Sequence, residues 1–316
     1  MTRIVVSEYL GERFLDLLRD GYEVEYDADL YGQREQLLAS VAGAKAILIR
    51  NRTRVDQEFV DVARDLVVVG RLGVGLDNID MEACASAGIL VKPAIGANAV
   101  SVAEYVLGAM LAMLRPVFGM TGSMVSGQWP RQGHAFGTEA SGKTLGLLGF
   151  GSIARHVARR AAAFDMVIIA HDPYIPVGDP LWGQAERVSF DDLLERSDVL
   201  SVHTPLTEAT HHLIGAAAFG LMKPTAVLIN TSRGGVVDEV ALASALRGGI
   251  IGGAALDVFA IEPLGVEAAS RFAGLDNLLL TPHVAGNTKE SVDRVAEVTV
   301  ANVLEVLAAT PDRSGA

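Results

Sequence analysis

The sequence is poor in cysteine, in positive charge and in long hydrophobic runs, and each shortage excludes a class of protein. Cys84 is the only cysteine among 316 residues, which excludes an internal disulfide and a cysteine metal cluster. A formal net charge of -12 at pH 7 would repel a phosphate backbone. The longest uncharged stretch, residues 116–130, is shorter than the roughly 20 apolar residues that span a bilayer. We therefore expect no metal centre, no nucleic-acid partner and no membrane contact.

The N-terminus also lacks a secretion signal. The first residues, "MTRIVVSEYLGERF", begin with a short apolar run followed by charges. They have neither the apolar core nor the small-residue cleavage site of a signal peptide. Together with the lone cysteine, which suits a reducing compartment, this predicts a cytoplasmic protein.

The composition that is present points to parallel sheets covered by helices. Half of the residues are hydrophobic, only 6% are aromatic and 33 are glycine, which suits strands buried on both faces. A chain of 316 residues is too long for one ordinary core and fits two domains. We predict an α/β protein with two doubly wound parallel-sheet domains.

Two series of strand-like runs support this prediction. In the first part of the chain, β-branched runs alternate with helix-length patterns such as 34–42 and 56–64, as in a parallel α/β unit. These runs lie at 3–7, 22–27, 46–50, 66–71 and 89–92. The second series lies at 143–150, 166–172, 199–204, 226–231, 251–259 and 277–283. Six strands with intervening helices match a dinucleotide-binding fold.

Three further segments lie outside these strand and helix series: a buried helix, a glycine-rich segment and a helix near the C-terminus. Residues 99–114 have helical length and are apolar on nearly every face, which indicates a helix buried on several sides. Residues 118–139 are glycine-rich without clear periodicity, and a segment of that length is usually functional or packed on a partner chain. Residues 289–308 are expected to form a helix that packs back on the first domain.

The first strand of the second series ends in a candidate cofactor loop. It reads "GFGSIA", residues 149–154, and a helical pattern follows. In such a turn Gly149 and Gly151 let the backbone approach a pyrophosphate, which binds at the positive end of the helix. Glycine-rich turns also occur between strands and helices for packing reasons, so this pattern alone is a weak signal.

Asp172 strengthens the interpretation of the cofactor loop. It closes the next strand 21 residues after Gly151, where a carboxylate accepts hydrogen bonds from the adenosine ribose. A carboxylate there would also repel a 2′-phosphate, which favours NAD over NADP. The alternative is an exposed turn aspartate before Pro173.

Three polar residues at later strand ends form a candidate catalytic set: Arg233 in "NTSRGG", Glu262 in "DVFAIEP" and His283 in "TPHVAGNT". Ligands bind at the carboxyl ends of strands in open α/β sheets. An arginine can hold a substrate carboxylate with its planar fork, a histidine can exchange a hydroxyl proton near neutrality, and a carboxylate can orient the histidine ring.

Each of these residues also has a structural interpretation. His283 could be a hydrogen-bonded structural histidine, Glu262 a solvated turn acid and Arg233 a partner of Asp238. Taken together, they suit hydride transfer between a nicotinamide and a 2-hydroxy or 2-keto acid.

The chain resembles the D-isomer-specific 2-hydroxyacid dehydrogenases, in particular the phosphoglycerate dehydrogenase branch. The matching stretches are "GRLGVGLDNID" at 70–80, "NAVSVAEYVLGAML" at 98–111, "GTEASGKTLGLLGFGSIA" at 137–154, "LINTSRGGVVDE" at 228–239, "ALDVFAIEP" at 255–263 and "TPHVAGNT" at 281–288. The resemblance implies that Arg233, Glu262 and His283 are the catalytic residues.

The resemblance also implies a domain organisation. A flavodoxin-like substrate domain, residues 1–97 and 286–316, would be split by an inserted Rossmann NAD-binding domain, residues 98–285. Family members are commonly dimers through the cofactor domain, so we expect a homodimer.

Further binding residues follow from the cofactor loop and from the resemblance. Those expected to bind the cofactor are Gly149, Gly151, Ser152, Ile153, Asp172, His203, Thr204, Pro205, Thr231, Asp257 and His283. Those expected to bind substrate are Arg50, Asn51, Val74, Gly75, Arg233 and His283. A packing turn is the alternative reading of Val74 and Gly75.

The identity of the substrate is less determined than its class. The arginines of "RNRTR", residues 50–54, would suit a second anionic group, although charge runs are usually solvated. Candidates are 3-phosphoglycerate, sulfolactate, glycerate or hydroxypyruvate, and malate-like acids. The stretches "RNRTR" and "GRLGVGLDN" together somewhat resemble sulfolactate dehydrogenases. An NAD-sensing, partner-binding protein of the same fold is an alternative, but the presence of all three chemical residues favours an enzyme.

Overall fold

The computed structural model describes residues 2–131 and 137–310 and divides the chain into two units. Unit 1 comprises Met1–Asn98 and Asn287–Ala316, and unit 2 comprises Ala99–Gly286. Residues 132–136 of the predicted glycine-rich segment and residues 311–316 of the predicted substrate domain lie outside the described residues.

Unit 1 contains a five-stranded parallel sheet in the order β2-β1-β3-β4-β5. Its strands are β1 (Arg3–Val6), β2 (Glu23–Tyr26), β3 (Ala46–Ile49), β4 (Val68–Arg71) and β5 (Leu90–Pro93). Its helices are α1 (Glu12–Arg19), η1 (Leu30–Gly32), α2 (Arg34–Val41), α3 (Gln57–Val62), α4 (Met81–Ser86) and α12 (Lys289–Ala309). This strand order is that of flavodoxin-like sheets.

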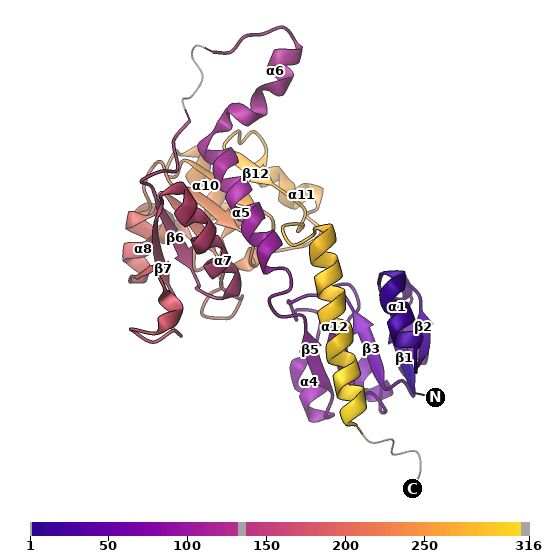
Figure 1. The fold of residues 1–316 in the computed structure, drawn as a ribbon. Coiled ribbons are helices and arrows are strands. Elements are labelled where there is room, and N and C mark those ends of the chain that lie inside the picture. The colour runs from indigo at the N-terminus through magenta and orange to yellow at the C-terminus, as the bar shows by residue number, and fades with distance from the viewer. Residues whose placement is uncertain (1, 132–136, 311–316) are drawn as a thin grey trace. The chain divides into compact units, whose positions relative to one another are not determined.

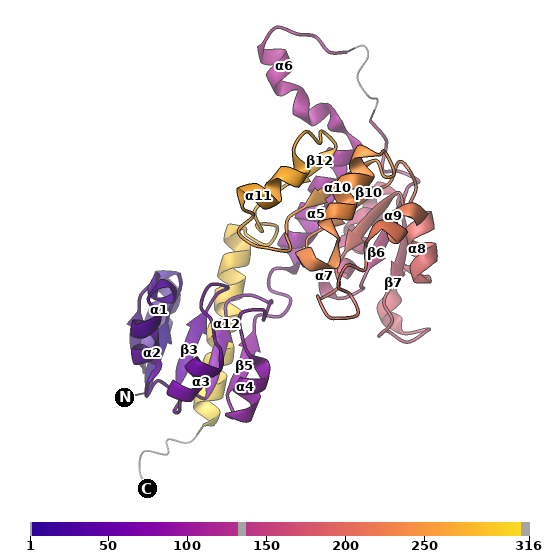
Figure 2. The ribbon, with the colours of Figure 1, turned by 180° about the vertical axis from the view of Figure 1, so that it is seen from behind.

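Helices cover both faces of this sheet. One buried cluster joins α1 and α12 to the strands, and a second joins α2, α3 and α4 to the opposite face. Helix α12, drawn in yellow, lies along the sheet in both views (Figures 1 and 2). It approaches β4 closely because Gly70 has no side chain: a Cβ there would lie 2.5 Å from a methyl carbon of Val303. The expected packing of the C-terminal helix on the first unit is therefore observed.

Unit 2 contains a seven-stranded parallel sheet in the order β12-β11-β10-β9-β6-β7-β8. Its strands are β6 (Thr144–Leu148), β7 (Val167–His171), β8 (Glu186–Arg187), β9 (Val199–Val202), β10 (Val227–Asn230), β11 (Gly253–Leu256) and β12 (Leu278–Leu280). Six of these strands follow the doubly wound order of dinucleotide-binding folds, and β12 extends the sheet beyond β11. The sequence does not indicate β8, because this strand has only two residues and no β-branched run.

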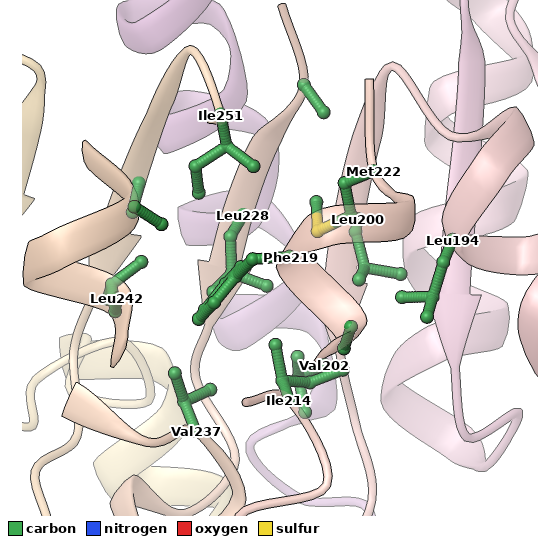
Figure 3. Packing of buried hydrophobic residues seen from close by; sticks show 14 of the residues in the cluster. Leu194, Leu200, Val202, Ile214, Phe219, Met222, Leu228, Val237, Leu242 and Ile251 are labelled. Atoms are coloured by element: carbon green, nitrogen blue, oxygen red, sulfur yellow. The ribbon is translucent and has the colours of Figure 1, made fainter. Parts of the chain in front are cut away.

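The remaining elements of unit 2 are helices. They are α5 (Ala99–Leu114), η2 (Pro116–Met120), α6 (Thr121–Val125), α7 (Ser152–Ala161), η3 (Ala162–Phe164), η4 (Pro180–Trp182), α8 (Phe190–Arg196), α9 (Ala216–Leu221), η5 (Gly234–Val236), α10 (Glu239–Arg247), α11 (Val266–Ala269) and η6 (Ser270–Phe272). Helices α5 and α7 pack on one face, and α8, α9 and α10 pack on the other. Figure 3 shows side chains of the second of these cores, including Phe219, Leu228 and Leu242.

The predicted fold class, two doubly wound parallel-sheet domains, is confirmed. The predicted helix at 99–114 is α5, and burial inside unit 2 explains its apolar character. The strands predicted at 251–259 and 277–283 are shorter than expected. The chain leaves the sheet after Leu256 and Leu280, and the next side chains, Asp257 and Thr281, are hydrogen-bonded to each other.

The segment after α5 is partly helical. Helices η2 and α6 project from the rest of unit 2 in both views (Figures 1 and 2). Among the described residues no single helix is long and apolar enough to cross a membrane; α5 and residues Pro116–Val125, which meet at a 76° bend, reach that length and hydropathy only as a pair.

Candidate active site

The three candidate catalytic residues follow three neighbouring strands of unit 2. Arg233 comes after β10, Glu262 after β11 and His283 after β12. These strands are paired in parallel, β10 with β11 and β11 with β12. Because parallel strands end at the same edge of a sheet, the three loops share one edge.

Glu262 and His283 form the central pair of this edge. The His283 Nδ1 atom lies 2.7 Å from Glu262 Oε2, and Glu262 Oε1 accepts a hydrogen bond of 3.0 Å from the Phe259 amide. With Nδ1 donating to the carboxylate, Nε2 is the acceptor nitrogen of the ring, and it has no hydrogen-bond partner within residues 2–131 and 137–310. Glu262 is therefore more than a solvated turn acid.

The loop that carries Arg233 is held by a buried asparagine. Asn230 is fully buried; its Nδ2 donates to the Arg233 carbonyl oxygen at 2.9 Å, and its Oδ1 accepts from the Ser232 amide and hydroxyl. The Asp238 carboxylate accepts from backbone amides of α10 as that helix's N-cap. These bonds assign Asp238 to the start of the helix.

The loops after β10 and β11 are in direct backbone contact. A Cβ at Gly234 would lie 1.9 Å from the Phe259 carbonyl carbon, so only glycine fits there. Glu239, which is 5% exposed, also holds the loop after β11. Its carboxylate accepts a hydrogen bond from the Ala260 amide at 2.6 Å and forms an ion pair with Arg271. Sequence reasoning missed Glu239, since an acid in the first turn of a helix normally only favours the helix dipole.

The predicted cofactor loop follows β6. Gly149 has a φ of 84°, and a Cβ there would lie 2.8 Å from the His203 carbonyl oxygen. Gly151 is the N-cap of α7, makes no side-chain cap, and faces open space where a Cβ would lie. The first amides of α7 are thus accessible to an anion, and these residues fit the pyrophosphate of a dinucleotide. Ser152 and Ile153 form the first turn of the same helix.

Asp172 has two backbone partners in this structure. Its Oδ2 accepts from the Phe150 amide at 2.9 Å, and its Oδ1 accepts from the Tyr174 amide at 3.0 Å. The second bond is the turn contact that the alternative interpretation expects. The first connects the carboxylate to the cofactor loop, next to which an adenosine ribose would have to lie.

The segment His203–Pro205 follows β9, at the same edge of the sheet as the cofactor loop. Burial lowers the pKa of His203 to about 4, so its ring is neutral at pH 7. The ring nitrogen Nε2 lies 2.9 Å from the Ser201 hydroxyl.

Thr231 and Asp257, both expected to contact the cofactor, differ in their bonding. The Thr231 hydroxyl is buried and has no hydrogen-bond partner within the described residues. Asp257 is 1% exposed, and its carboxylate accepts from the Thr281 hydroxyl and the Val284 and Ala285 amides. An orphaned polar atom such as the Thr231 hydroxyl is a signal of a missing partner.

The residues expected to bind substrate in unit 1 follow two of its neighbouring strands. Arg50 and Asn51 come after β3, and Val74 and Gly75 come after β4. The Asn78 side-chain amide links these loops by donating to the Arg50 carbonyl oxygen at 3.0 Å.

The backbone of residues 50–53 is fixed by one buried carboxylate. Glu8 is 4% exposed and accepts from the amides of Arg50, Arg52 and Thr53 and from the Thr53 hydroxyl. The guanidinium groups point elsewhere: that of Arg50 contacts Tyr9 and that of Arg52 contacts Tyr31.

Fold and site together define a class. A dinucleotide-binding sheet with an open helix N-terminus and an adjoining histidine–carboxylate–arginine set is the arrangement of a nicotinamide-dependent oxidoreductase. A family model described as D-isomer specific 2-hydroxyacid dehydrogenase, NAD binding domain, matches residues 107–285.

Relatives agree with that match over nearly the full chain. The chain is 48% identical to the (S)-sulfolactate dehydrogenase of Chromohalobacter salexigens over 97% of its own length and 99% of the relative's. It is 37% identical to a hydroxypyruvate reductase of Thermotoga maritima, covering 96% of this chain and 98% of the relative. With a D-3-phosphoglycerate dehydrogenase of Archaeoglobus fulgidus it shares 36% identity over 99% of this chain but only 58% of the relative.

A solved structure agrees as well. The TT0316 protein from Thermus thermophilus superposes with a TM-score of 0.88 at 36% identity, covering 99% of both chains. The chain therefore belongs to the D-isomer-specific 2-hydroxyacid dehydrogenase family. It is an NAD-dependent oxidoreductase of 2-hydroxy acids, and no finding favours the alternative of a partner-binding NAD sensor.

Proposed function

We propose that this enzyme interconverts a D-2-hydroxy acid that carries a second anionic group with its 2-keto acid, and that sulfolactate is the best candidate. The observation that carries the chemical part is the 2.7 Å contact between His283 Nδ1 and Glu262 Oε2, beside a loop that bears Arg233. In this proposal unit 2 binds the cofactor and unit 1 contributes to substrate binding.

Each catalytic residue has one task. Arg233 binds the substrate carboxylate and polarises the carbonyl oxygen, because a guanidinium offers several donors in one plane. His283 Nε2 accepts the hydroxyl proton during oxidation and returns it to the carbonyl oxygen during reduction. Glu262 keeps the ring oriented through its contact with Nδ1. When bound, NAD accepts the hydride from C2 of the hydroxy acid.

Residues of unit 2 would hold the cofactor. The amides at the start of α7 and Gly151 suit the pyrophosphate, and Asp172 suits the adenosine ribose. The orphaned Thr231 hydroxyl supports a ligand beside β10, and the half-buried His203 adds a neutral ring at the same edge of the sheet. Thr204, Pro205 and Asp257 complete the proposed set.

Arginines of unit 1 would bind the second anionic group of the substrate. Arg50 and Arg52 stand on a loop whose backbone is fixed by Glu8. Burial lowers the pKa of Arg50. Within residues 2–131 and 137–310 its guanidinium forms no ion pair and donates to the Tyr9 carbonyl oxygen. Arg50 contacts the carbonyl oxygen and ring of Tyr9, and Arg52 contacts the hydroxyl and ring of Tyr31. Such cations can bind a sulfonate or phosphate without breaking an ion pair. Val74 and Gly75 would supply backbone amides to the carboxylate.

The stereochemistry of the named relative is consistent with the family. In sulfolactate the sulfomethyl group outranks the carboxylate, because sulfur has a higher atomic number than oxygen. The S isomer at C2 therefore has the spatial arrangement of a D-2-hydroxy acid. A D-specific site is thus compatible with the name of the Chromohalobacter relative, (S)-sulfolactate dehydrogenase, and stereochemistry does not argue against sulfolactate.

A substrate screen tests the proposal. NADH oxidation is followed with four 2-keto acids that differ in the group on C3. These are sulfopyruvate with a sulfonate, phosphohydroxypyruvate with a phosphate, hydroxypyruvate with a hydroxyl and pyruvate with hydrogen only. We expect the highest kcat/KM with sulfopyruvate. A preference for the uncharged ends would contradict the assigned substrate, and NADH binding without turnover on any member would contradict the assigned reaction.

We further propose a homodimer formed through the segment after α5. Its apolar side chains Phe118, Val125 and Trp129 are 70%, 83% and 74% exposed, which is unusual for large apolar groups unless a partner covers them. Sedimentation analysis should give twice the monomer mass, and Phe118→Ser with Trp129→Ser should give the monomer. Val240→Ser, an equally polar change at an exposed site of α10, is the matched control. A monomeric wild type would contradict the dimer.

A cytoplasmic location belongs to the same proposal. A reducing compartment suits the one buried thiol, Cys84, and it supplies the NADH that the reaction uses. Localisation of the tagged full-length chain in its source organism tests this, and recovery of the protein outside the cytoplasm would contradict it.

A further inference from the structure

We propose that Tyr105 of helix α5 is a positioning residue for His283, acting through Thr281 and Asp257. The Tyr105 hydroxyl lies 2.5 Å from the Thr281 hydroxyl, which donates to Asp257 Oδ1 at 2.6 Å. The inference builds on the proposed catalytic role of His283. It assigns a task to two side chains, Tyr105 and Thr281, that belong neither to the proposed catalytic set nor to the proposed binding set.

Asp257 holds the loop of His283 from both sides. Before the histidine, the Thr281 hydroxyl donates to the carboxylate; after it, the Val284 amide donates to Oδ1 at 2.9 Å and the Ala285 amide to Oδ2 at 2.8 Å. The His283 amide itself donates to the Asp257 carbonyl oxygen at 2.8 Å. Every one of these acceptors belongs to a residue that is 1% exposed, so water competes little for them.

This loop needs such support because His283 has an unfavourable backbone conformation. Its φ is 54°, the left-handed region, which costs a residue other than glycine about 1 kcal/mol or more. Without the bonds to Asp257 the loop would relax toward ordinary dihedral angles. The imidazole would then move away from Glu262, and a shift of about 1 Å is enough to slow a proton transfer strongly.

The direction of the hydrogen bonds makes Tyr105 the outermost donor. An ionised carboxylate only accepts, and a threonine hydroxyl has a single hydrogen. Because Thr281 gives its hydrogen to Asp257, the bond between the two hydroxyls must be donated by Tyr105. Burial and the nearby Asp257 charge raise the pKa of Tyr105, so its hydroxyl keeps this hydrogen throughout the neutral pH range. Tyr105 thereby fixes the rotamer in which Thr281 faces Asp257.

The test removes single hydroxyl groups and measures both turnover and the loop. In the full-length enzyme, Tyr105→Phe and the isosteric Thr281→Val are compared with Thr281→Ser, which keeps the donor. We expect kcat to fall about 3-fold to 10-fold in Tyr105→Phe and about 10-fold or more in Thr281→Val, as for other lost hydrogen bonds of a positioning network. KM for NADH should change less than about twofold, and Thr281→Ser should recover most of kcat.

Hydrogen–deuterium exchange of residues 281–286 provides a readout independent of activity. Tyr105→Phe and Thr281→Val should both speed exchange of the Val284 and Ala285 amides. Peptides from the core strand β9 should stay protected in both variants. Tyr22→Phe, a half-buried tyrosine of unit 1, is the matched control and should change neither quantity.

Four results would overturn the inference: unchanged exchange at 281–286, unchanged kcat, faster exchange throughout unit 2, or equal losses in Thr281→Val and Thr281→Ser. If the wild type turns over no keto acid, the proposed function fails. In that case the exchange data still decide whether Tyr105 and Thr281 hold the His283 loop.

Discussion

The loops at the carboxyl ends of the two sheets are built differently. In unit 2 the loops after β10, β11 and β12 are locked by buried side chains: Asn230 holds the Arg233 loop, Glu239 the Glu262 loop and Asp257 the His283 loop. In unit 1 the buried Glu8 fixes only the backbone of residues 50–53, and the guanidinium groups extend from it over aromatic rings. One edge is preorganised, and the other is adaptable.

The difference follows from the chemistry that each edge is proposed to perform. Proton transfer and stabilisation of a developing oxyanion require groups that are in place before the reaction starts. Recognition of a remote anion requires only a cation within a few ångströms, which a long, mobile arginine can supply. The comparison therefore predicts that changes in unit 2 affect kcat strongly and that changes in unit 1 affect KM weakly.

Arg233→Ala should have the largest effect. Loss of the guanidinium removes the donor to the carbonyl oxygen, where negative charge develops, so kcat/KM should fall about 10³-fold or more, close to 4 kcal/mol. NADH binding, followed by its fluorescence, should stay nearly intact. Arg233→Lys should restore little activity, because an ammonium cannot bind in two-point fashion.

The matched control for Arg233 is Arg247→Ala, an exposed arginine at the end of α10. It should leave turnover unchanged. If Arg233→Ala weakened NADH binding as much as turnover, Arg233 would bind the cofactor and not the substrate. The preorganised edge of unit 2 could then not be assigned to the chemical step.

Much of this architecture could be predicted from the sequence because its signals are local. The glycine loop at 149–154 and the run "NTSRGG" each combine a strand end with residues of special backbone freedom. Burial on both faces gives parallel strands nearly continuous apolar runs, so most of them were found. The two-residue β8 was missed, since such a strand carries no periodicity.

The interlocking of the loops could not be predicted, because it joins residues far apart in the chain. Tyr105 and Thr281 are 176 residues apart, and the pattern of neither indicates a hydrogen bond. Asp257 was expected at the cofactor by resemblance, but no sequence pattern indicated the three hydrogen bonds through which its carboxylate holds the His283 loop. The direction in which arginines 50 and 52 point also depends on the rings of Tyr9 and Tyr31, which no spacing rule places beside them.

Asp172→Ala should change the cofactor preference, the second largest effect. The carboxylate is expected to bind the ribose of NAD and to repel the 2′-phosphate of NADP. The ratio of the two dissociation constants should shift toward NADP by about 30-fold to 100-fold, which is the range for a lost charged hydrogen bond. Calorimetric titration of both cofactors measures it.

A second variant separates the charge of Asp172 from its structural bond. Asp172→Asn keeps an oxygen acceptor for the Phe150 amide but removes the negative charge. It should relax the preference while leaving the cofactor loop in place. An unchanged preference in both variants would show that Asp172 acts only as the turn residue before Pro173.

His203 tests whether water is excluded from the preorganised edge of unit 2. Its pKa, about 4 in the folded chain through burial, lies below the roughly 6.5 of an unfolded histidine. Between these two values the unfolded chain binds a proton that the folded chain does not, so the free energy of unfolding falls as pH decreases. By linkage the loss between pH 7 and pH 5 is about 2 kcal/mol. Urea unfolding of His203→Gln should lack this part of the pH dependence, and parallel slopes for both proteins would contradict it.

Arg52→Ala, a change at the adaptable edge of unit 1, should have the smallest effect on catalysis. Its guanidinium lies 2.5 Å from the Tyr31 hydroxyl, and its Cζ atom lies 5.0 Å from the centroid of the Tyr31 ring. A partly exposed charge pair contributes about 1 kcal/mol, so KM for sulfopyruvate should rise about 5-fold while kcat changes less than twofold. Added salt should shrink the difference between variant and wild type, and pyruvate, which lacks the anionic end, should be reduced equally by both. A loss of kcat comparable to that of Arg233→Ala would mean that the arginines of unit 1 take part in the chemical step itself, and the division between a preorganised and an adaptable edge would have to be abandoned.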